Sequence, residues 1–193
     1  MNKILIKTLI ISFFFISLNA TAEIKHIKDG NVDAKVKLVV FESLTCSHCG
    51  DFHRDIYPKL KTDFIDKNLI IIEYRNFPLD ISAFNAAKIA HCRNDGKSEI
   101  LHHLYNNQSS WVRGSTIEDL NKNLKRVVQE SGFKLDFDNC IANSKIEDFI
   151  LDDRIKGAKK FKIQATPTLI INGEKFENAS NYKKLKKYLE KLI

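Results

Sequence analysis

The sequence predicts an α/β fold in which strand-forming segments at both ends of the chain enclose a long helical block. Three observations support this class. A strand, a helix and a second strand follow one another between about residues 36 and 76. No strand-like run occurs from 81 to 157, and a β-hairpin with a final helix closes the chain. Strands that alternate with helices in this way are typical of the α/β class.

The first 22 residues have the composition of a secretory signal peptide. Lys3 and Lys7 lie in a short basic region, residues 9–18 are almost wholly apolar, and residues 20–22 (Ala-Thr-Ala) match the pattern that precedes cleavage. The apolar run is too short to span a membrane. We therefore expect residues 1–22 to be removed and the mature chain, 23–193, to reach the periplasm. An uncleaved N-terminal anchor is the alternative.

The charge of the chain gives no sign of a nucleic-acid partner. The net charge of +7 falls to +5 without the two lysines of the signal segment. Basic residues are scattered among 24 acidic ones and are locally dense only at 183–187 (Lys-Lys-Leu-Lys-Lys). Apolar residues recur there at helical spacing, so these lysines form the outer face of an amphipathic helix. We expect no nucleic-acid binding.

The first predicted strand leads directly to the most reactive side chains of the sequence. Residues 36–41 (Val-Lys-Leu-Val-Val-Phe) are nearly continuously apolar, as in a strand that is covered on both faces. Large apolar residues then recur at positions 52, 56, 60 and 64, which predicts a helix to about residue 67. Pro58 lies inside it and predicts a kink. Residues 69–74 (Leu-Ile-Ile-Ile-Glu-Tyr) are the second strand.

The block from 81 to 157 contains helix starts and no strand signal. Residues 115–118 (Ser-Thr-Ile-Glu) and 144–147 (Ser-Lys-Ile-Glu) fit the capping-box pattern. Strand character returns at 168–171, and Asn172-Gly173 predicts a type I′ hairpin turn. We therefore divide the mature chain into a sheet-bearing domain, 23–80 with 158–193, and a helical insertion, 81–157.

Cys46 and Cys49 form a Cys-x-x-Cys pair at the start of the helix that follows the first strand. The free N–H groups and the dipole of a first helical turn stabilise negative charge, so we expect Cys46 to ionise near or below neutral pH. His48 adds an N–H donor and, when protonated, a positive charge beside that sulfur. The pair is therefore predicted to be a redox-active dithiol in which Cys46 attacks and Cys49 resolves mixed disulfides.

A metal site is the main alternative for the same residues. Structural zinc usually takes two closely spaced pairs of ligands, and the sequence has no second Cys-x-x-Cys and no His-x-x-x-His. A copper carrier that uses Cys46 and Cys49 with His48 or His53 is chemically conceivable in an exported protein. A redox-silent chaperone that holds peptides is a further alternative. We expect no metal and no other cofactor.

A second motif stands far downstream, immediately before the later strand. In Ala165-Thr166-Pro167-Thr168 the proline cannot donate to a strand ladder and is able to adopt the cis form. The turn is predicted to face the cysteine pair and to leave the backbone of Thr166 free for an extended substrate segment. Thr166 and Pro167 are therefore predicted to bind substrate.

Residues 41–49 (Phe-Glu-Ser-Leu-Thr-Cys-Ser-His-Cys), the following Phe52-His53 and residues 165–168 together resemble the DsbA family of thioredoxin-fold oxidoreductases. The resemblance implies a thioredoxin fold interrupted by a helical domain and a cis Thr166–Pro167 bond. It implies an enzyme that introduces disulfides into reduced, unfolded exported proteins and is reoxidised by a membrane partner of the DsbB type.

A disulfide isomerase or reductase of the same superfamily is the alternative to an oxidase. The isomerases typically carry an N-terminal dimerisation segment, and the short stretch from residue 23 to residue 45 leaves no room for one. We therefore expect a monomeric oxidase.

Two positions depart from the pattern of the best-known oxidases. Ser47 stands where they have proline, so the resemblance does not assign a potential. Many thioredoxin-fold proteins also place a buried acid six residues before the first cysteine, where this chain has Val40. Glu42 lies two residues further on and on the same strand face. It either replaces that acid as a proton relay or is a solvated residue at the end of the strand.

Cys92 and Cys140 both fall in the helical insertion. Some members of the DsbA family carry a second pair in this region that forms a structural or regulatory disulfide, so the resemblance implies a Cys92–Cys140 bridge. In the chain-entropy model, closing such a loop adds about 4 kcal/mol to the stability of the folded protein. Two separate buried thiols are the alternative, which fits an oxidising compartment less well.

Overall fold

The structure is a computed structural model that describes residues 23–193, and the predicted signal peptide lies outside the described residues. Its centre is a five-stranded sheet in the order β1-β3-β2-β4-β5. β2 and β3 are parallel, and the other neighbouring strands are antiparallel. The strands are β1 (Ile27–Gly30), β2 (Val36–Glu42), β3 (Ile70–Asn76), β4 (Thr168–Ile171) and β5 (Glu174–Phe176).

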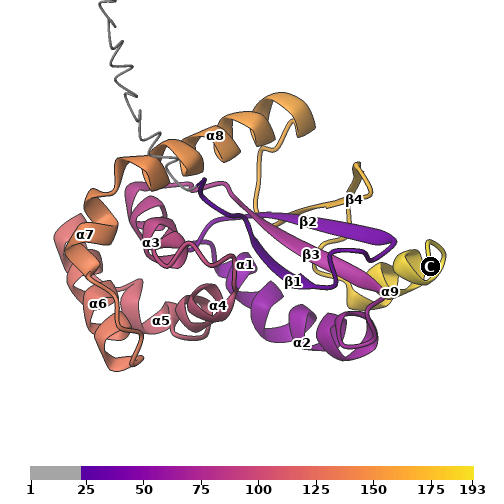
Figure 1. The fold of residues 1–193 in the computed structure, drawn as a ribbon, viewed down its shortest axis with the longest axis horizontal. Coiled ribbons are helices and arrows are strands. Elements are labelled where there is room, and N and C mark those ends of the chain that lie inside the picture. The colour runs from indigo at the N-terminus through magenta and orange to yellow at the C-terminus, as the bar shows by residue number, and fades with distance from the viewer. Residues whose placement is uncertain (1–22) are drawn as a thin grey trace, which may run out of the picture.

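Helices cover both faces of this sheet, and a cluster of helices lies at one end of it (Figure 1). In the view of Figure 1, α2 and α9 lie below the strands and α8 runs above them. Among residues 23–193, no helix is both long and apolar enough to cross a bilayer. The helices are α1 (Ser47–Asp51), α2 (Tyr57–Leu60), α3 (Ile81–His91), α4 (Glu99–Asn106), α5 (Gln108–Trp111), α6 (Ile117–Glu130), α7 (Phe137–Ala142), α8 (Ser144–Phe161) and α9 (Tyr182–Glu190).

β2 is the central strand because both of its faces are covered. Val36, Leu38 and Val40 on one face are fully buried in the main core. Phe41 on the other face packs against the end of α8 at Phe161. The nearly continuous apolar run that predicted this strand is therefore explained by burial on both faces.

The helix after the cysteine pair is built from alternating α- and π-helical turns. Two π-helical stretches, η1 (Phe52–Ile56) and η2 (Lys61–Ile65), flank α2. Pro58 has no N–H to give to the carbonyl four residues before it. In η1 the N–H of Tyr57 donates to the carbonyl of Phe52, five residues back, so the wider turn precedes the proline. The expected disturbance at Pro58 thus takes the form of a π-helical stretch.

Several boundaries differ from the sequence analysis. The short strand β1 was not predicted, because its sequence (Ile-Lys-Asp-Gly) carries no apolar alternation. Both capping boxes are displaced by one residue: Thr116 caps α6 and Asn143 caps α8. The expected domain boundary at residue 157 falls inside α8. The type I′ turn is confirmed, since Asn172 and Gly173 have φ of 49° and 94°.

A buried carboxylate ties α8 to the sheet. Asp153 is only 2% exposed and accepts a hydrogen bond from Arg75 Nη1 at 2.9 Å. Its second oxygen accepts from the backbone N–H of Asn76 at 3.1 Å and from Asn76 Nδ2 at 2.9 Å. Asp153 thus holds α8 on the end of β3 by three hydrogen bonds.

Asp153→Ala is expected to lower the free energy of unfolding by about 3 kcal/mol, because it leaves a partly buried Arg75 with one carboxylate fewer. The matched control is Asp152→Ala, which removes an exposed pair with Lys156 one turn away and should cost less than about 0.5 kcal/mol. Urea unfolding of the oxidised proteins measures both values. Equal losses in the two variants would show that Asp153 does not anchor α8.

Candidate active site

The loop after β2 places Cys46 at the start of α1. Cys46 is the N-cap residue, with extended backbone angles, and its carbonyl accepts from the N–H of Gly50 at 3.1 Å. Both Cys46 and Cys49 are free thiols; Cys46 is half-buried and Cys49 has no exposed surface. One sulfur of the pair can therefore be reached from solvent and the other cannot.

The surroundings of Cys46 favour its thiolate. A hydrogen bond from the Cys49 thiol is the largest cause that lowers the pKa of Cys46, to about 5, against the opposing effect of partial burial. Thr166 and the backbone N–H groups of Cys49 and His48 lower it further. These amides belong to the first turn of α1, where N–H groups have no partner within the helix. Cys46 is therefore ionised at neutral pH when the pair is reduced.

The inner thiol has the opposite character. Burial raises the pKa of Cys49 far above its ordinary value, and the neighbouring Cys46 and Glu42 act in the same direction. The reduced pair therefore holds one thiolate and one thiol.

His48 acts on this pair through its backbone. Its amide N–H is one of the groups that lower the pKa of Cys46. Its side chain is 81% exposed and lies 3.7 Å from Asp51, so the imidazole is at the surface.

The turn at Thr166–Pro167 faces Cys46, as the sequence predicted. The bond between these residues is cis, and the Cys46 sulfur lies 3.3 Å from the carbonyl oxygen of Thr166. A cleft of about 310 Å³ opens beside the two segments. The side chains that line it come from α1, η1, the cis-proline turn and the stretch before α9: His48, Asp51, Phe52, Asp55, Ile56, Thr166, Pro167, Glu177, Ala179 and Ser180.

Glu42 is buried, so the alternative of a solvated residue at the strand end is wrong. It is 6% exposed, on the same face of β2 as Val40, where side chains of η1 cover it. Its Oε2 lies 2.7 Å from Nε2 of His53. Burial raises the pKa of Glu42 well above its usual range, which favours the protonated carboxyl.

Gln108, from α5, was missed by the sequence analysis. Its Nε2 donates to the carbonyls of Leu44 at 2.8 Å and Cys46 at 3.0 Å, which fixes the loop that carries the reactive thiol. Gly50 makes room for it, because a Cβ at that position would collide with Gln108 Oε1. No local pattern reveals this contact, since it joins residues more than 60 positions apart.

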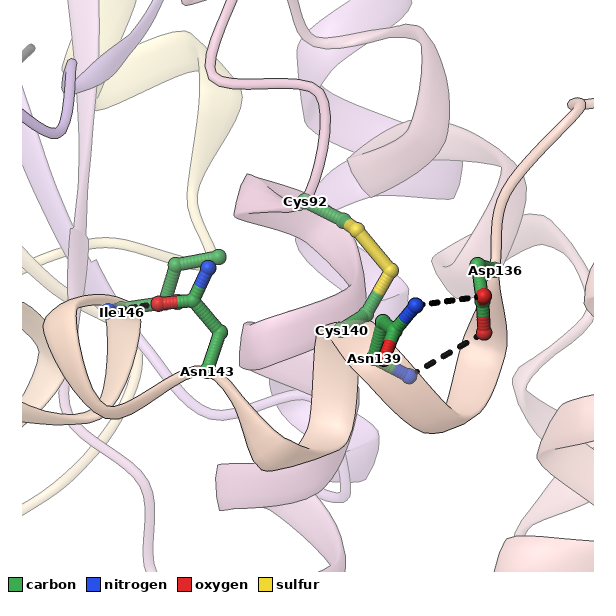
Figure 2. Close-up of a disulfide and its surroundings, with 6 residues drawn as sticks. All are labelled: Cys92, Asp136, Asn139, Cys140, Asn143 and Ile146. Atoms are coloured by element: carbon green, nitrogen blue, oxygen red, sulfur yellow. Dashed lines mark hydrogen bonds between the residues drawn. A yellow bond between two sulfur atoms is a disulfide. The ribbon is translucent and has the colours of Figure 1, made fainter.

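Cys92 and Cys140 are joined by a disulfide within the helical cluster (Figure 2). Their Cα atoms are 5.4 Å apart, and the bond links the end of α3 to α7. Figure 2 shows Asp136 at the start of α7, where its carboxylate accepts from the N–H of Asn139 at 3.1 Å. Among residues 23–193, no group of three or more His, Cys, Asp or Glu side chains is arranged to hold a metal ion.

Titration of the reduced protein, followed by the ultraviolet absorbance of the thiolate, should show one ionisation with a midpoint about pH 5. The pKa lies below the ordinary value of 9.0, so the stabilisation is complete above pH 9 and is lost as the pH falls to about 5. The reduced form should therefore gain stability over the oxidised form as the pH rises through this window. Cys46→Ser is the control that abolishes the transition; a midpoint near 9 would contradict the site described.

Gly50→Ala should displace Gln108 and lower the free energy of unfolding by about 1–3 kcal/mol, through crowding and the loss of two hydrogen bonds. Gln108→Ala removes the same bonds without crowding. The double variant should therefore be less destabilised than the sum of the single variants, measured by urea unfolding. Strictly additive losses would mean that Gly50 and Gln108 are not in contact.

Comparison with known proteins agrees with this geometry. A family model described as Thioredoxin matches residues 23–191. The crystal structure of alpha-DsbA1 from Wolbachia pipientis superposes with a TM-score of 0.78 at 30% identity, covering 86% of this chain and 90% of that one. Oxidised BdbD from Bacillus subtilis gives a TM-score of 0.74 at 24% identity, covering 86% and 92%, and shows the same fold.

Two curated relatives carry names that refer to disulfides. A Rickettsia bellii protein, named provisionally as a protein-disulfide oxidoreductase, is 30% identical over 78% of this chain and 58% of its own length. Disulfide bond formation protein D of Bacillus subtilis is 28% identical over 84% of this chain and 74% of its own length. The chain thus spans less than two thirds of the Rickettsia relative. On the family match and the fold, the chain belongs to the thioredoxin family and, within it, to the DsbA-like proteins.

Proposed function

We propose that this protein introduces disulfide bonds into exported proteins by dithiol–disulfide exchange at Cys46 and Cys49. The observation that carries the proposal is the asymmetry of the pair. Cys46 is half-exposed and has a pKa lowered to about 5, whereas Cys49 is fully buried and stays protonated. An accessible sulfur that is stable as a thiolate is a good leaving group, and its partner is held in place to close the ring.

The exchange proceeds in two displacements. A substrate thiolate attacks Cys46 of the oxidised pair, the Cys46–Cys49 bond breaks, and Cys49 leaves as a thiolate that takes a proton. A second substrate thiolate then attacks the substrate sulfur of the mixed disulfide and releases Cys46 as a thiolate. Two electrons pass from the substrate dithiol to the cysteine pair, and the substrate gains one disulfide.

The stable Cys46 thiolate favours oxidation of substrate over reduction. It lowers the free energy of the reduced enzyme and has no counterpart in the disulfide form, so the equilibrium favours transfer of the disulfide to substrate. The cleft beside Pro167 supports the binding of an extended substrate segment against the cis-proline turn. The same asymmetry supports an oxidase over an isomerase or reductase.

Further parts of this proposal follow from the predicted signal peptide and from family membership. The oxidase works as a monomer in the periplasm on reduced, unfolded exported proteins, and a DsbB-like membrane protein reoxidises it. Glu42 gives the leaving Cys49 thiolate its proton, which its burial beside His53 supports. The Cys92–Cys140 disulfide stabilises the helical insertion.

Equilibration with glutathione buffers should give the Cys46–Cys49 pair a reduction potential of about −200 to −120 mV, because its reduced form is stabilised. Alkylation of free thiols followed by mass measurement reports the reduced fraction. Cys92→Ala/Cys140→Ala is the control that assigns the potential to the active pair. A thioredoxin-like value of about −270 mV would contradict the oxidase function.

Cys49→Ala should accumulate mixed disulfides through Cys46 with exported proteins in oxidising growth, since the resolving thiol is gone. Non-reducing electrophoresis and mass spectrometry of the purified variant identify the adducts. Cys46→Ala keeps only the buried thiol and should trap none. If both variants yield equally few adducts, the protein does not exchange disulfides with substrates through Cys46.

A further inference from the structure

A chain of hydrogen bonds leads from Glu42 through two histidines to Asp29. Glu42 Oε2 lies 2.7 Å from His53 Nε2, and His53 Nδ1 lies 3.0 Å from His102 Nδ1. His102 Nε2 lies 2.9 Å from Asp29 Oδ2. In each ring, one nitrogen makes the hydrogen bond on the side of the active site and the other makes the hydrogen bond on the opposite side. Four side chains from β2, η1, α4 and β1 form one continuous line of acid–base groups.

The inner end of this line is dry and the outer end reaches solvent. The side chains of His53 and Glu42 are 1% and 5% exposed. Those of His102 and Asp29 are 18% and 17% exposed. Glu42 is close enough to Cys49 that its ionised form raises the pKa of that thiol. The line therefore connects the surroundings of the buried cysteine with water on the far side of η1.

The hydrogen bonds have one consistent direction. Asp29 accepts from Ser98 Oγ at 2.5 Å and from Tyr74 Oη at 3.0 Å as well as from His102, and despite its burial these bonds lower the pKa of Asp29. Asp29 is therefore an ionised acceptor, so His102 donates through Nε2–H. Its Nδ1 then accepts from His53 Nδ1–H.

The other end of the line completes this pattern. Burial lowers the pKa of His53 well below its usual range, which keeps the ring neutral. With its Nδ1 donating, Nε2 of His53 accepts from the protonated Glu42 carboxyl. Every polar hydrogen in the line has an acceptor, which satisfies the requirement for buried polar groups.

Aromatic side chains enclose the two rings. Tyr105 stacks on His53 with ring centroids 3.9 Å apart, Tyr57 lies 4.1 Å from His102, and Tyr74 lies 5.4 Å from His53. Burial raises the pKa of all three phenols, so none ionises in the working pH range. None of the three tyrosines therefore supplies a proton to the line.

We propose that His53 and His102 relay protons between solvent and Glu42, so that Cys49 exchanges its proton through the protein interior. This inference rests on the proposed function and adds the route of the proton to it. In the mixed disulfide the substrate is bound to Cys46 and occupies the cleft beside it, which closes the outer route to Cys49. The line of histidines approaches from the opposite side.

The proton count closes over one turnover. When the mixed disulfide forms, Cys49 is released as a thiolate and takes the carboxyl proton of Glu42. At this point the preceding reoxidation has left the ring hydrogens on His53 Nε2 and His102 Nδ1, the tautomers opposite to those of the reduced pair. Glu42 regains a proton from His53 Nε2, His53 receives one at Nδ1 from His102 Nδ1, and His102 takes one from solvent at Nε2, which restores the tautomers of the reduced pair. One proton moves from solvent to Cys49, and each imidazole gives one proton and receives one.

Reoxidation of the reduced pair runs the line outward. Cys49 gives its proton to Glu42, Glu42 gives its own to His53 Nε2, His53 gives its Nδ1 proton to His102 Nδ1, and His102 releases its Nε2 proton to solvent.

His102→Ala tests the relay because it removes the imidazole that links His53 to solvent, while Glu42 and His53 remain. The readout is the single-turnover rate at which the oxidised protein oxidises a reduced two-cysteine peptide, measured between about pH 5 and 9. The variant should be slower by about 10- to 100-fold at the alkaline end, where protons are scarce, and close to wild type at the acidic end. His103→Ala is the matched control, since His103 neighbours His102 but lies outside the line: its Nε2 is 3.3 Å from the Val127 carbonyl and its ring packs against Phe133.

Rescue by small molecules separates a relay from a structural role. Added imidazole should restore the alkaline rate of His102→Ala, whereas 1-methylimidazole, which has the same shape but one blocked nitrogen, should not. His102→Gln keeps an N–H for Asp29 and fills the gap, so it should be slow and insensitive to imidazole. Equal rescue by both compounds, or a uniform loss of rate at every pH, would overturn the relay.

The outcome also separates this inference from the proposed function. If wild type and His102→Ala oxidise the peptide equally fast at every pH, the relay is wrong and the oxidase stands. If the wild-type protein does not oxidise the peptide at all, the proposed function fails first, and the relay with it.

Discussion

The hydrogen bond from the buried Cys49 thiol to Cys46 is the interaction on which the rest of the active site depends. It is the largest cause of the low pKa of Cys46, and it exists only while Cys49 keeps its proton. Cys49 is buried in the main hydrophobic core, and this burial raises the pKa of its thiol, so the proton is retained. The acidity of the outer thiol is therefore a consequence of how deeply the inner one is packed.

The helical insertion supplies much of this environment. Gln108 from α5 fixes the loop before α1, and Tyr105 and His102 from α4 close the space behind the cysteine pair. η1 brings His53 between them, in a wider turn that precedes Pro58. π-Helical turns of this kind are frequently found at functional sites, where they redirect a side chain. The insertion therefore forms one wall of the active site.

The sequence predicted those features that depend on local order. β2, β4, the hairpin and the Cys-x-x-Cys helix start follow from periodicity and turn chemistry over a few residues. That the Thr166–Pro167 turn faces Cys46 was predicted from the order of the strands and from the family resemblance. The contacts of Gln108 with the cysteine loop, and of His102 with His53 and Asp29, could not be predicted in this way. Each joins segments 49 or more positions apart. For Glu42 the sequence left two roles open, since strand parity gives a face of the sheet but does not say what covers it.

The dependence of the reduction potential on pH tests most directly whether the reduced pair holds one thiolate and one thiol. If Cys46 is ionised and Cys49 is not, reduction takes up two electrons and one proton, so the potential falls by about 30 mV per pH unit above pH 5. The slope should steepen to about 59 mV per unit below that pH, where both thiols are protonated. A slope of about 59 mV per unit up to pH 9 would mean that Cys46 keeps its proton, which would contradict the account.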